Sequence, residues 1–368
     1  MPNKLKPSLD WLLALVPVAF ALEYIPGLHN PTALFVCSGL AIIPLAGIMG
    51  RATEQLSEHL GQGWGGFLNA TFGNAAELII ALLALQKGLI GVVKASITGS
   101  IIGNILLVLG AAIAAGGVKF SEQRFNRTAV QTSTSSLMLA SIGLLIPTVF
   151  HYSAASQGAW NAALERKLSL AIAVVLFVTY IGNLVFTLVT HKHVLAANSG
   201  DDASLREQIA PAWSKTKSTV VLFVSTIFVA VLSEFLVSTV ETTRASLGVT
   251  EVFIGVIVVA IIGNAAEHST AIWMAMKNKL DLSLGIAIGS SLQVALFVAP
   301  VLVFVSYFLG HPMDLEFTIP EVVSVIVAVV IVAEISRDGR TNWLEGVQLL
   351  SVYIILAILF YFLPALAH

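Results

Sequence analysis

Two glutamates, Glu77 and Glu267, each close the same five-residue motif, Gly-Asn-Ala-Ala-Glu, inside long apolar stretches of the chain. The motifs occupy residues 73–77 and 263–267, an offset of 190 residues. An ionised group at the centre of a bilayer costs roughly 2.5–3.5 kcal/mol on insertion scales, and no Lys or Arg lies within either helix core. Each carboxyl group must therefore be protonated or paired with a cation; the alternative role is a neutral, hydrogen-bonded packing residue.

The groups around the two carboxylates favour a hard cation. Asn74 and Asn264 offer amide oxygens, and a helix broken at Gly73 or Gly263 would free backbone carbonyls, although small residues also allow close helix packing. Calcium takes six to eight oxygens at about 2.3–2.6 Å, whereas magnesium gives up its water reluctantly. Two carboxylates neutralise one divalent ion, so the motifs indicate a Ca²⁺ site, with Mn²⁺ as a second choice. The expected metal ligands are Glu77, Glu267, Asn74 and Asn264.

The same electrostatics predicts an exchange reaction. Without a cation, loss of hydration and mutual repulsion favour the neutral acids, and a bound divalent cation displaces their protons. The site crosses the membrane loaded with either the cation or protons, because the empty dianion is too costly to bury. The expected transported ions are thus Ca²⁺ and H⁺, without a resident cofactor.

Polar residues in the following apolar stretches are candidates for supporting roles. Ser100 and Ser290 are separated by the same 190-residue offset, whereas Asn104 and Gln293 each occur in one copy. His268 follows Glu267 directly, where it either tunes that carboxylate, relays protons or simply packs. A membrane Ser also commonly bonds its own helix backbone, so this alternative stays open for both serines.

Three further acids are candidates for the path to the site, two near opposite membrane surfaces (Glu54 and Glu241) and one deeper in the membrane (Glu234). Glu54 and Glu241 are equivalent under a slightly shifted repeat, and Glu234 lies inside the stretch 218–240. They are expected to attract cations into the vestibules of the site; the alternative is a solvated charge at a helix end.

The elements that must position these residues are membrane helices. Hydrophobic residues make up 57% of the 368 positions and charged residues only 11%, less than half the share of about 25% in soluble domains. A helix needs about 20 apolar residues to cross a bilayer, which predicts an all-α membrane protein with eleven spans. They are roughly 9–27, 32–50, 64–87, 91–116, 128–150, 169–191, 218–240, 252–277, 283–309, 318–335 and 344–366.

Basic residues set the expected orientation of these spans. Sorting the connections alternately onto two sides divides the 19 Lys and Arg residues 14 to 5, with the larger share on the side of the N-terminus. The N-terminus should therefore face the cytoplasm. The first span also resembles a signal peptide with a possible cleavage site, Ala-Phe-Ala at 19–21, and its removal would leave the remaining topology intact.

The repeated motifs divide the chain into two halves of opposite orientation. The repeat extends without a gap from 73–100 to 263–290, and its copies lie five predicted helices apart. Because five is odd, equivalent helices run in opposite directions, as in secondary transporters with inverted repeats. The expected parts are an N-terminal tail and extra helix (1–31), a first five-helix repeat (32–191), a cytoplasmic loop (192–217) and a second repeat (218–368).

Other classes of protein fit the sequence poorly. The single cysteine, Cys37, excludes an intramolecular disulfide and a cysteine-based zinc cluster. The chain has no basic arm that would indicate a nucleic-acid partner. The expected partners are the lipid bilayer and the transported ions, and the sequence is also compatible with a homo-oligomer. A membrane enzyme would need a Ser/His/Asp or His-rich arrangement, and a channel would usually repeat parallel subunits.

The motifs GNAAELIIALLAL and GNAAEHSTAI, with ATEQL, GGFLNATFGNAAE and NKLDLSLGIAIGS, resemble the cation/proton exchanger family of the calcium/cation antiporter superfamily. The resemblance covers residues 32–366. It implies a Ca²⁺/H⁺ antiporter with eleven helices, the first outside the repeats, and implies that Glu77 and Glu267 alternate between cation and protons. Sodium-using relatives carry a GNSAPE-like pattern that is absent here, yet a sodium-coupled exchanger remains the alternative. The short chain suggests a microbial plasma membrane, or else a vacuolar one.

Overall fold

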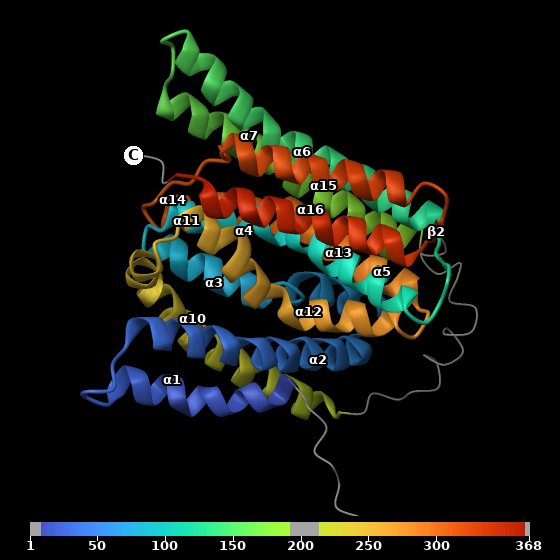
Figure 1. The fold of residues 1–368 in the computed structure, drawn as a ribbon, viewed down its shortest axis with the longest axis horizontal. Coiled ribbons are helices and arrows are strands. Elements are labelled where there is room, and N and C mark those ends of the chain that lie inside the picture. The colour runs from blue at the N-terminus through green and yellow to red at the C-terminus, as the bar shows by residue number, and fades with distance from the viewer. Residues whose placement is uncertain (1–8, 192–212, 365–368) are drawn as a thin grey trace, which may run out of the picture.

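The computed structural model describes residues 9–191 and 213–364, which are almost entirely helical (Figure 1). In the first half the elements are η1 (Leu9–Ala14), α1 (Leu15–Tyr24), α2 (Pro31–Phe72), α3 (Ala75–Gln86), α4 (Ile90–Ile102), η2 (Gly103–Val108), α5 (Leu109–Gly117), β1 (Gln123–Arg124), α6 (Arg127–Ser156), α7 (Ala162–Val185) and η3 (Phe186–Thr190). In the second half they are α10 (Lys215–Leu247), α11 (Glu251–Phe253), η4 (Ile254–Val259), α12 (Ala260–Ala275), α13 (Leu280–Gln293), η5 (Val294–Val298), α14 (Ala299–Phe308), α15 (Ile319–Ile335), β2 (Arg340–Thr341) and α16 (Trp343–Phe362).

Eight helical stretches in the described part of the chain are long and apolar enough to cross a membrane. They are Pro31–Leu60, Ile90–Gly117, Arg127–Ser156, Ala162–Thr190, Lys215–Leu247, Glu251–Ala275, Leu280–Phe308 and Trp343–Phe362. Large apolar side chains such as Val175, Ile355 and Phe362 are exposed on their outer surfaces, as expected where lipid rather than water is the solvent. The predicted all-α membrane architecture is therefore confirmed in this form.

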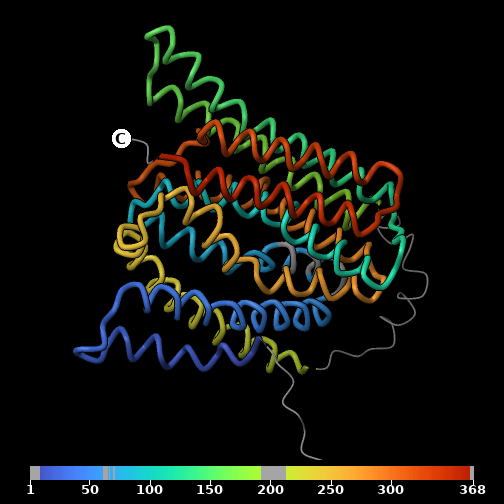
Figure 2. Tube along the Cα trace, viewed as in Figure 1, coloured from blue at the N-terminus to red at the C-terminus, as the bar shows by residue number. Residues whose placement is uncertain are grey.

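The helices of the two halves interleave. Helices α1, α2 and α10 form one layer, and the other helices stack on it with α15 and α16 far from that layer (Figures 1 and 2). Principal contacts pair α2 with α10, α4 with η4, α5 with α16, α6 with α15 and α7 with α14. Each pair joins an element before the undescribed residues 192–212 to one after them, so neither half forms its core alone.

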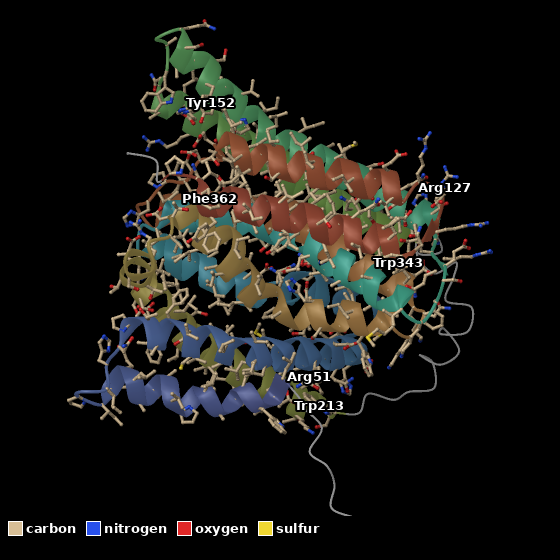
Figure 3. The ribbon with its side chains drawn as sticks, in the orientation of Figure 1. Arg51, Arg127, Tyr152, Trp213, Trp343 and Phe362 are labelled. Carbon is tan, nitrogen blue, oxygen red and sulfur yellow. The ribbon has the colours of Figure 1, made fainter. Side chains whose placement is uncertain are left out.

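The two ends of the bundle are distinguished by their labelled side chains. Arg127 and Trp343 lie at one end, and Tyr152 and Phe362 lie at the other (Figure 3). We call these the Trp343 end and the Phe362 end. The two-residue strands β1 and β2 pair at the Trp343 end, with Gln123 opposite Thr341.

The structure differs from the predicted spans near the first motif. The sequence predicts separate helices at 32–50 and 64–87, whereas α2 runs without interruption from Pro31 to Phe72. The segment between the predicted helices, residues 51–63, contains two each of Gln, Glu and Leu, which are strong helix formers, and the helix therefore continues through it. The chain breaks instead at Gly73 and Asn74, where Asn74 has φ −100° and ψ 23°, and α3 starts at Ala75.

The second motif does not break its helix. Gly263 and Asn264 lie within the continuous helix α12, so a break at Gly263 is a wrong prediction. The irregular backbone precedes the motif, in the π-helical segment η4. Two other π-helical segments, η2 and η5, follow Ser100 and Ser290 at nearly the same offset as the motifs. Such segments open the backbone hydrogen-bond ladder and commonly lie at functional sites.

Candidate functional site

Glu77 is held in the first turn of α3 by groups from two other helices. The Ser100 hydroxyl of α4 donates a hydrogen bond of 2.7 Å to Glu77 Oε1. The Asn264 amide of α12 donates to the same oxygen. Gly263 allows this approach, because a Cβ at that position would lie 2.8 Å from Glu77 Cγ. The site is therefore built where α3, α4 and α12 meet.

The asparagine of each motif contacts the serine of the other half. Asn264 Nδ2 donates to Ser100 Oγ at 3.0 Å, and Ser290 Oγ donates to Asn74 Oδ1 at 3.0 Å. Asn74 Nδ2 also donates to Gln293 Oε1. This crossed pairing ties the two motifs into one network, and both asparagines are buried.

Asn104 is the residue that connects the two sides of this network. Its amide donates to Asn264 Oδ1 at 3.2 Å and to Ser290 Oγ at 3.1 Å. Its own Oδ1 lies 3.2 Å from His268 Nε2. Because an amide oxygen only accepts, the His268 Nε2 atom carries the hydrogen in this contact. Residue 294, which corresponds to Asn104 in the second repeat, is Val294, so this bridge exists in one half.

Glu267 lies one turn beyond Asn264 on α12, close enough to Glu77 for the two carboxylates to interact electrostatically. The Ser290 hydroxyl neighbours its carboxylate. Its Oε2 atom is buried and has no hydrogen-bond partner among the described residues. A buried carboxylate oxygen with free acceptor capacity can be satisfied by a proton or by a cation. The donor set contains carboxylate, amide and hydroxyl oxygens, which suits a hard divalent ion.

The three acids expected in the vestibules lie outside this network. Glu234 forms an ion pair with Lys87 at 2.6 Å, and Glu241 Oε2 accepts from Arg244 Nε at 2.8 Å. Glu54 is exposed on α2. The contacts of Glu234 and Glu241 do not join them to the ion site, and the place of all three acids on an ion path stays a prediction.

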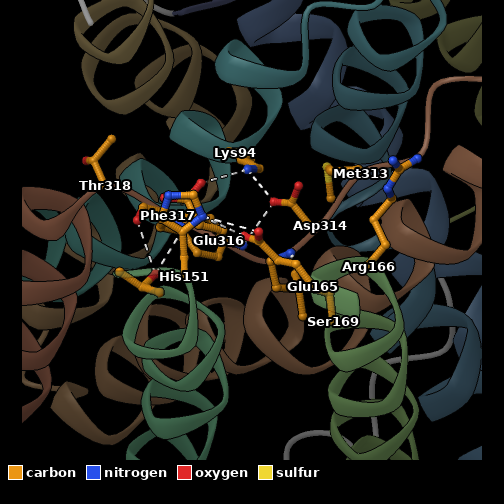
Figure 4. Close-up of polar contacts among 12 residues, drawn as sticks. Lys94, His151, Glu165, Arg166, Ser169, Met313, Asp314, Glu316, Phe317 and Thr318 are labelled. Atoms are coloured by element: carbon orange, nitrogen blue, oxygen red, sulfur yellow. Dashed lines mark hydrogen bonds and ion pairs between the residues drawn. The ribbon is translucent and has the colours of Figure 1, made fainter. Parts of the chain in front are cut away.

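A second, half-buried polar cluster was not singled out by the sequence motifs (Figure 4). Lys94 Nζ lies 2.5 Å from Asp314 Oδ1 and 3.3 Å from Glu316 Oε2. Glu165 accepts from His151 Nδ1 at 3.1 Å. We call these five residues the Lys94 cluster. In the sequence they are scattered over four elements and occur only as charges near span ends, which gives no signal that they meet.

The fold and the oxygen-rich network define a class of protein, the multi-pass membrane cation transporters. A family model described as "Sodium/calcium exchanger protein" matches residues 30–189 and 217–362. The chain belongs to this family, and the predicted resemblance is confirmed.

Individual relatives cover nearly the whole chain. It is 47% identical over 366 residues to the "Ca(2+)/H(+) antiporter" of Synechocystis sp., covering 96% of this chain and 97% of the relative. It is 48% identical to the "Ca(2+)/H(+) antiporter ChaA" of Bacillus subtilis, covering 91% and 94%. The "Vacuolar calcium ion transporter" of Schizosaccharomyces pombe is 38% identical, with 96% and 84% covered. These relatives are transporters and not enzymes.

The fold is shared with solved transporter structures. The native YfkE structure matches with a TM-score of 0.82 and 42% identity, covering 97% of this chain and 100% of that chain. The crystal structure of the "H+/Ca2+ Exchanger CAX" matches with a TM-score of 0.68 at 15% identity, covering 96% of this chain and 91% of that chain, which is a likeness of fold.

Proposed function

We propose that this protein exchanges Ca²⁺ for H⁺ across a membrane, with Glu77 and Glu267 binding either the cation or protons. The observation that carries the proposal is the oxygen network in which Glu77 and the GNAAE motif of α12 meet within the apolar helices. The names of relatives at 47% and 48% identity support the same ions.

The exchange follows from the electrostatics of two close carboxylates. Ionised together and without a cation, they repel each other and lose hydration, which favours uptake of protons. A divalent cation neutralises both and releases those protons. Asn74, Asn264, Ser100 and Ser290 supply further oxygens or hold the carboxylates, and Asn104, Gln293 and His268 orient those groups. Gly73 and Gly263 give the backbone break and the close approach, respectively.

We further infer alternating access between two inverted repeats. The repeat layout has eleven spans when Leu9–Tyr24, Ala75–Gln86 and Ile319–Ile335 are added to the eight long helices. The proposed divisions remain 1–31, 32–191, 192–217 and 218–368. The crossed Asn–Ser pairs support this layout, because each repeat supplies half of the network. If each repeat adopted the conformation of the other, the site would open to the opposite side of the membrane. Residues 192–212 of the expected cytoplasmic loop lie outside the described residues.

In this topology the N-terminus is cytoplasmic, in a microbial plasma membrane or a vacuolar one. Glu54 and Glu241 would then draw cations toward opposite mouths of the site, with Glu234 on one side. The rival is a sodium-coupled exchanger, since the family description includes sodium.

The test is uptake of ⁴⁵Ca²⁺ by purified protein in sealed vesicles. A pH gradient alone should drive uptake, and a sodium gradient at fixed pH should not. Glu77→Gln and Glu267→Gln should each abolish uptake, because a neutral amide can neither balance the cation nor carry the proton. The matched control is Glu334→Gln, an exposed acid that pairs with Arg337 far along α15. Uptake driven only by sodium would favour the rival, and near-normal uptake by either site variant would refute the assigned carboxylates.

A further inference from the structure

Helix α4 connects the ion site to the Phe362 end of the bundle. Ser100, which donates to Glu77, lies near its C-terminal end, and Lys94 lies six residues earlier. At 1.5 Å per residue this separation is about 9 Å along the helix. Between them, Thr98 Oγ1 donates to Glu321 Oε1 of α15 at 2.9 Å. The position of α4, and with it the Ser100 hydroxyl, therefore depends on what holds this face of the helix.

Lys94 is the strongest of these attachments. Its side chain is 15% exposed and contacts Asp314 and Glu316 of the segment 311–318, which has no regular secondary structure. Hydrogen bonds between charged groups are stronger than those between neutral groups. The segment is itself fixed, because Leu315 N donates to Ser169 Oγ at 2.9 Å and Phe317 N to Thr148 Oγ1 at 3.0 Å. Lys94 thus attaches α4 to a rigid support.

The Lys94 cluster has more negative than positive groups. One oxygen from each of Glu165, Asp314 and Glu316 lies within 4.8 Å of the others. Lys94 supplies one positive charge, so the cluster carries a formal −2 with His151 neutral and −1 with it protonated. Its charged and titratable neighbours are Tyr152 of α6, Arg166 of α7 and Glu321 of α15.

This surplus makes the attachment sensitive to protons. Burial raises the pKa of Glu316 above the ordinary carboxyl value, although Lys94 acts in the opposite direction. Glu316 therefore takes up a proton at a higher pH than a free carboxyl group as the solution is acidified. Once neutral, Glu316 no longer attracts the Lys94 ammonium.

The corresponding attachment in the second repeat has different chemistry. Residue 126 corresponds to residue 316 at the 190-residue offset of the motifs. There the backbone amide of Asn126 donates to Asp281 Oδ1 of α13 at 2.5 Å. This attachment at the Trp343 end is a single hydrogen bond from an uncharged backbone amide, so it lacks the ammonium–carboxylate pairs of the Lys94 cluster.

We propose that the Lys94 cluster is a proton-sensitive anchor at the Phe362 end that positions α4, and through it the Ser100 hydroxyl on Glu77. Lys94 is then a positioning residue for exchange. Protons reaching that end loosen α4 and weaken cation binding, in addition to competing at the two glutamates. The inference rests on the proposed Ca²⁺/H⁺ exchange.

The test compares Lys94→Met with wild type in reconstituted vesicles from mildly alkaline to mildly acidic pH. At alkaline pH the variant should need about three- to tenfold more Ca²⁺ for half-maximal uptake, as expected for partial loss of a hydrogen bond to a carboxylate. At acidic pH the ratio of variant to wild type should approach one, because wild type loses the same attachment. Direct proton competition cancels in this ratio. Lys94→Arg keeps the charge and should restore wild-type affinity.

The repeat supplies a matched control in Asp281→Ala. This substitution removes an acceptor that attaches α13 and not α4, so hydrogen exchange of the α4 amides should stay as in wild type. A constant ratio for Lys94→Met, or wild-type affinity in that variant, would overturn the anchor. If Lys94→Met does not fold, Glu316→Gln decides the matter: it should show the acidic behaviour of wild type at every pH, and wild-type pH dependence would overturn the proposal.

A second measurement separates this inference from the proposed function. Hydrogen exchange of the α4 amides, residues 90–102, should be faster in Lys94→Met and in wild type at acidic pH. Absence of Ca²⁺ uptake by wild type would refute the exchange function and not the anchor. Protection of α4 that is unchanged by both the substitution and acid would refute the anchor.

Discussion

Replacing Gly263 with Ala adds one methyl group at the closest approach of α12 to Glu77. The new Cβ would lie 2.8 Å from Glu77 Cγ, whereas carbon atoms pack at about 3.5–4.0 Å. One of the two must move by about 1 Å. Glu77 cannot turn away freely, because its Oε1 atom accepts from Ser100 and Asn264. Moving α12 instead displaces Asn264, the next residue.

The expected magnitudes separate binding from stability. The new Ala stabilises a helix interior over Gly by up to about 1 kcal/mol, whereas overpacking destabilises the protein by about 1–3 kcal/mol. The net effect is a fall in the free energy of unfolding of about 2 kcal/mol or less. Each hydrogen bond to a carboxylate is worth about 1.5–3 kcal/mol. Losing one of them should weaken Ca²⁺ binding by about tenfold or more, since each 1.4 kcal/mol corresponds to a factor of about ten.

The assay is the Ca²⁺ concentration for half-maximal pH-driven uptake, measured beside thermal unfolding in detergent. Gly285→Ala is the matched control, because that α13 glycine has nothing within 4 Å of the added Cβ. It should gain slightly in stability and keep wild-type affinity. Wild-type affinity in Gly263→Ala would refute the argument that this glycine makes room for Glu77. Equal loss in both variants would attribute the effect to backbone stiffness instead.

Three other results are expected. Lys87→Glu and Glu234→Lys should each destabilise the protein, because each breaks the ion pair between these residues. In a double-mutant cycle measured by thermal unfolding, the double variant should recover up to about 1 kcal/mol, as for partly exposed ion pairs. If the changes in unfolding free energy of the two single variants simply add, the pair contributes nothing to stability. Asn104→Ala should weaken Ca²⁺ binding and cost about 1–3 kcal/mol in unfolding free energy, because it leaves buried partners unsatisfied; a variant as stable as wild type would contradict its role as a bridge. Apparent Ca²⁺ affinity should fall as the binding side is acidified, since protons and cation share the carboxylates, and affinity independent of pH in equilibrium binding would exclude that competition.

Much of the membrane architecture was predictable from hydropathy. The predicted stretches 128–150, 283–309 and 344–366 match α6, the α13–α14 helix and α16 within a few residues. The predicted boundary between 32–50 and 64–87 failed, because the polar residues between them still form helix. Hydropathy reports which residues avoid water, and it does not report where a helix stops.

The site was predictable as a set of residues and not as a set of contacts. The offset of the GNAAE motifs selected Glu77 and Glu267 together with their serines and asparagines. Nothing in the offset indicates that Asn264 would donate to Glu77, or that Asn104 would join Asn264 to Ser290. Those contacts depend on how α3, α4, α12 and α13 cross.

The sequence by itself determined that the chain is a helical membrane protein with a duplicated acidic motif, because the cost of burying polar groups in lipid is a property of each segment alone. Only the tertiary structure decided that α12 passes unbroken against Glu77, and that Lys94 meets acids more than 200 residues away. The physical reason is that such meetings depend on the packing of helices from both halves, which complementary surfaces determine jointly and no single segment encodes.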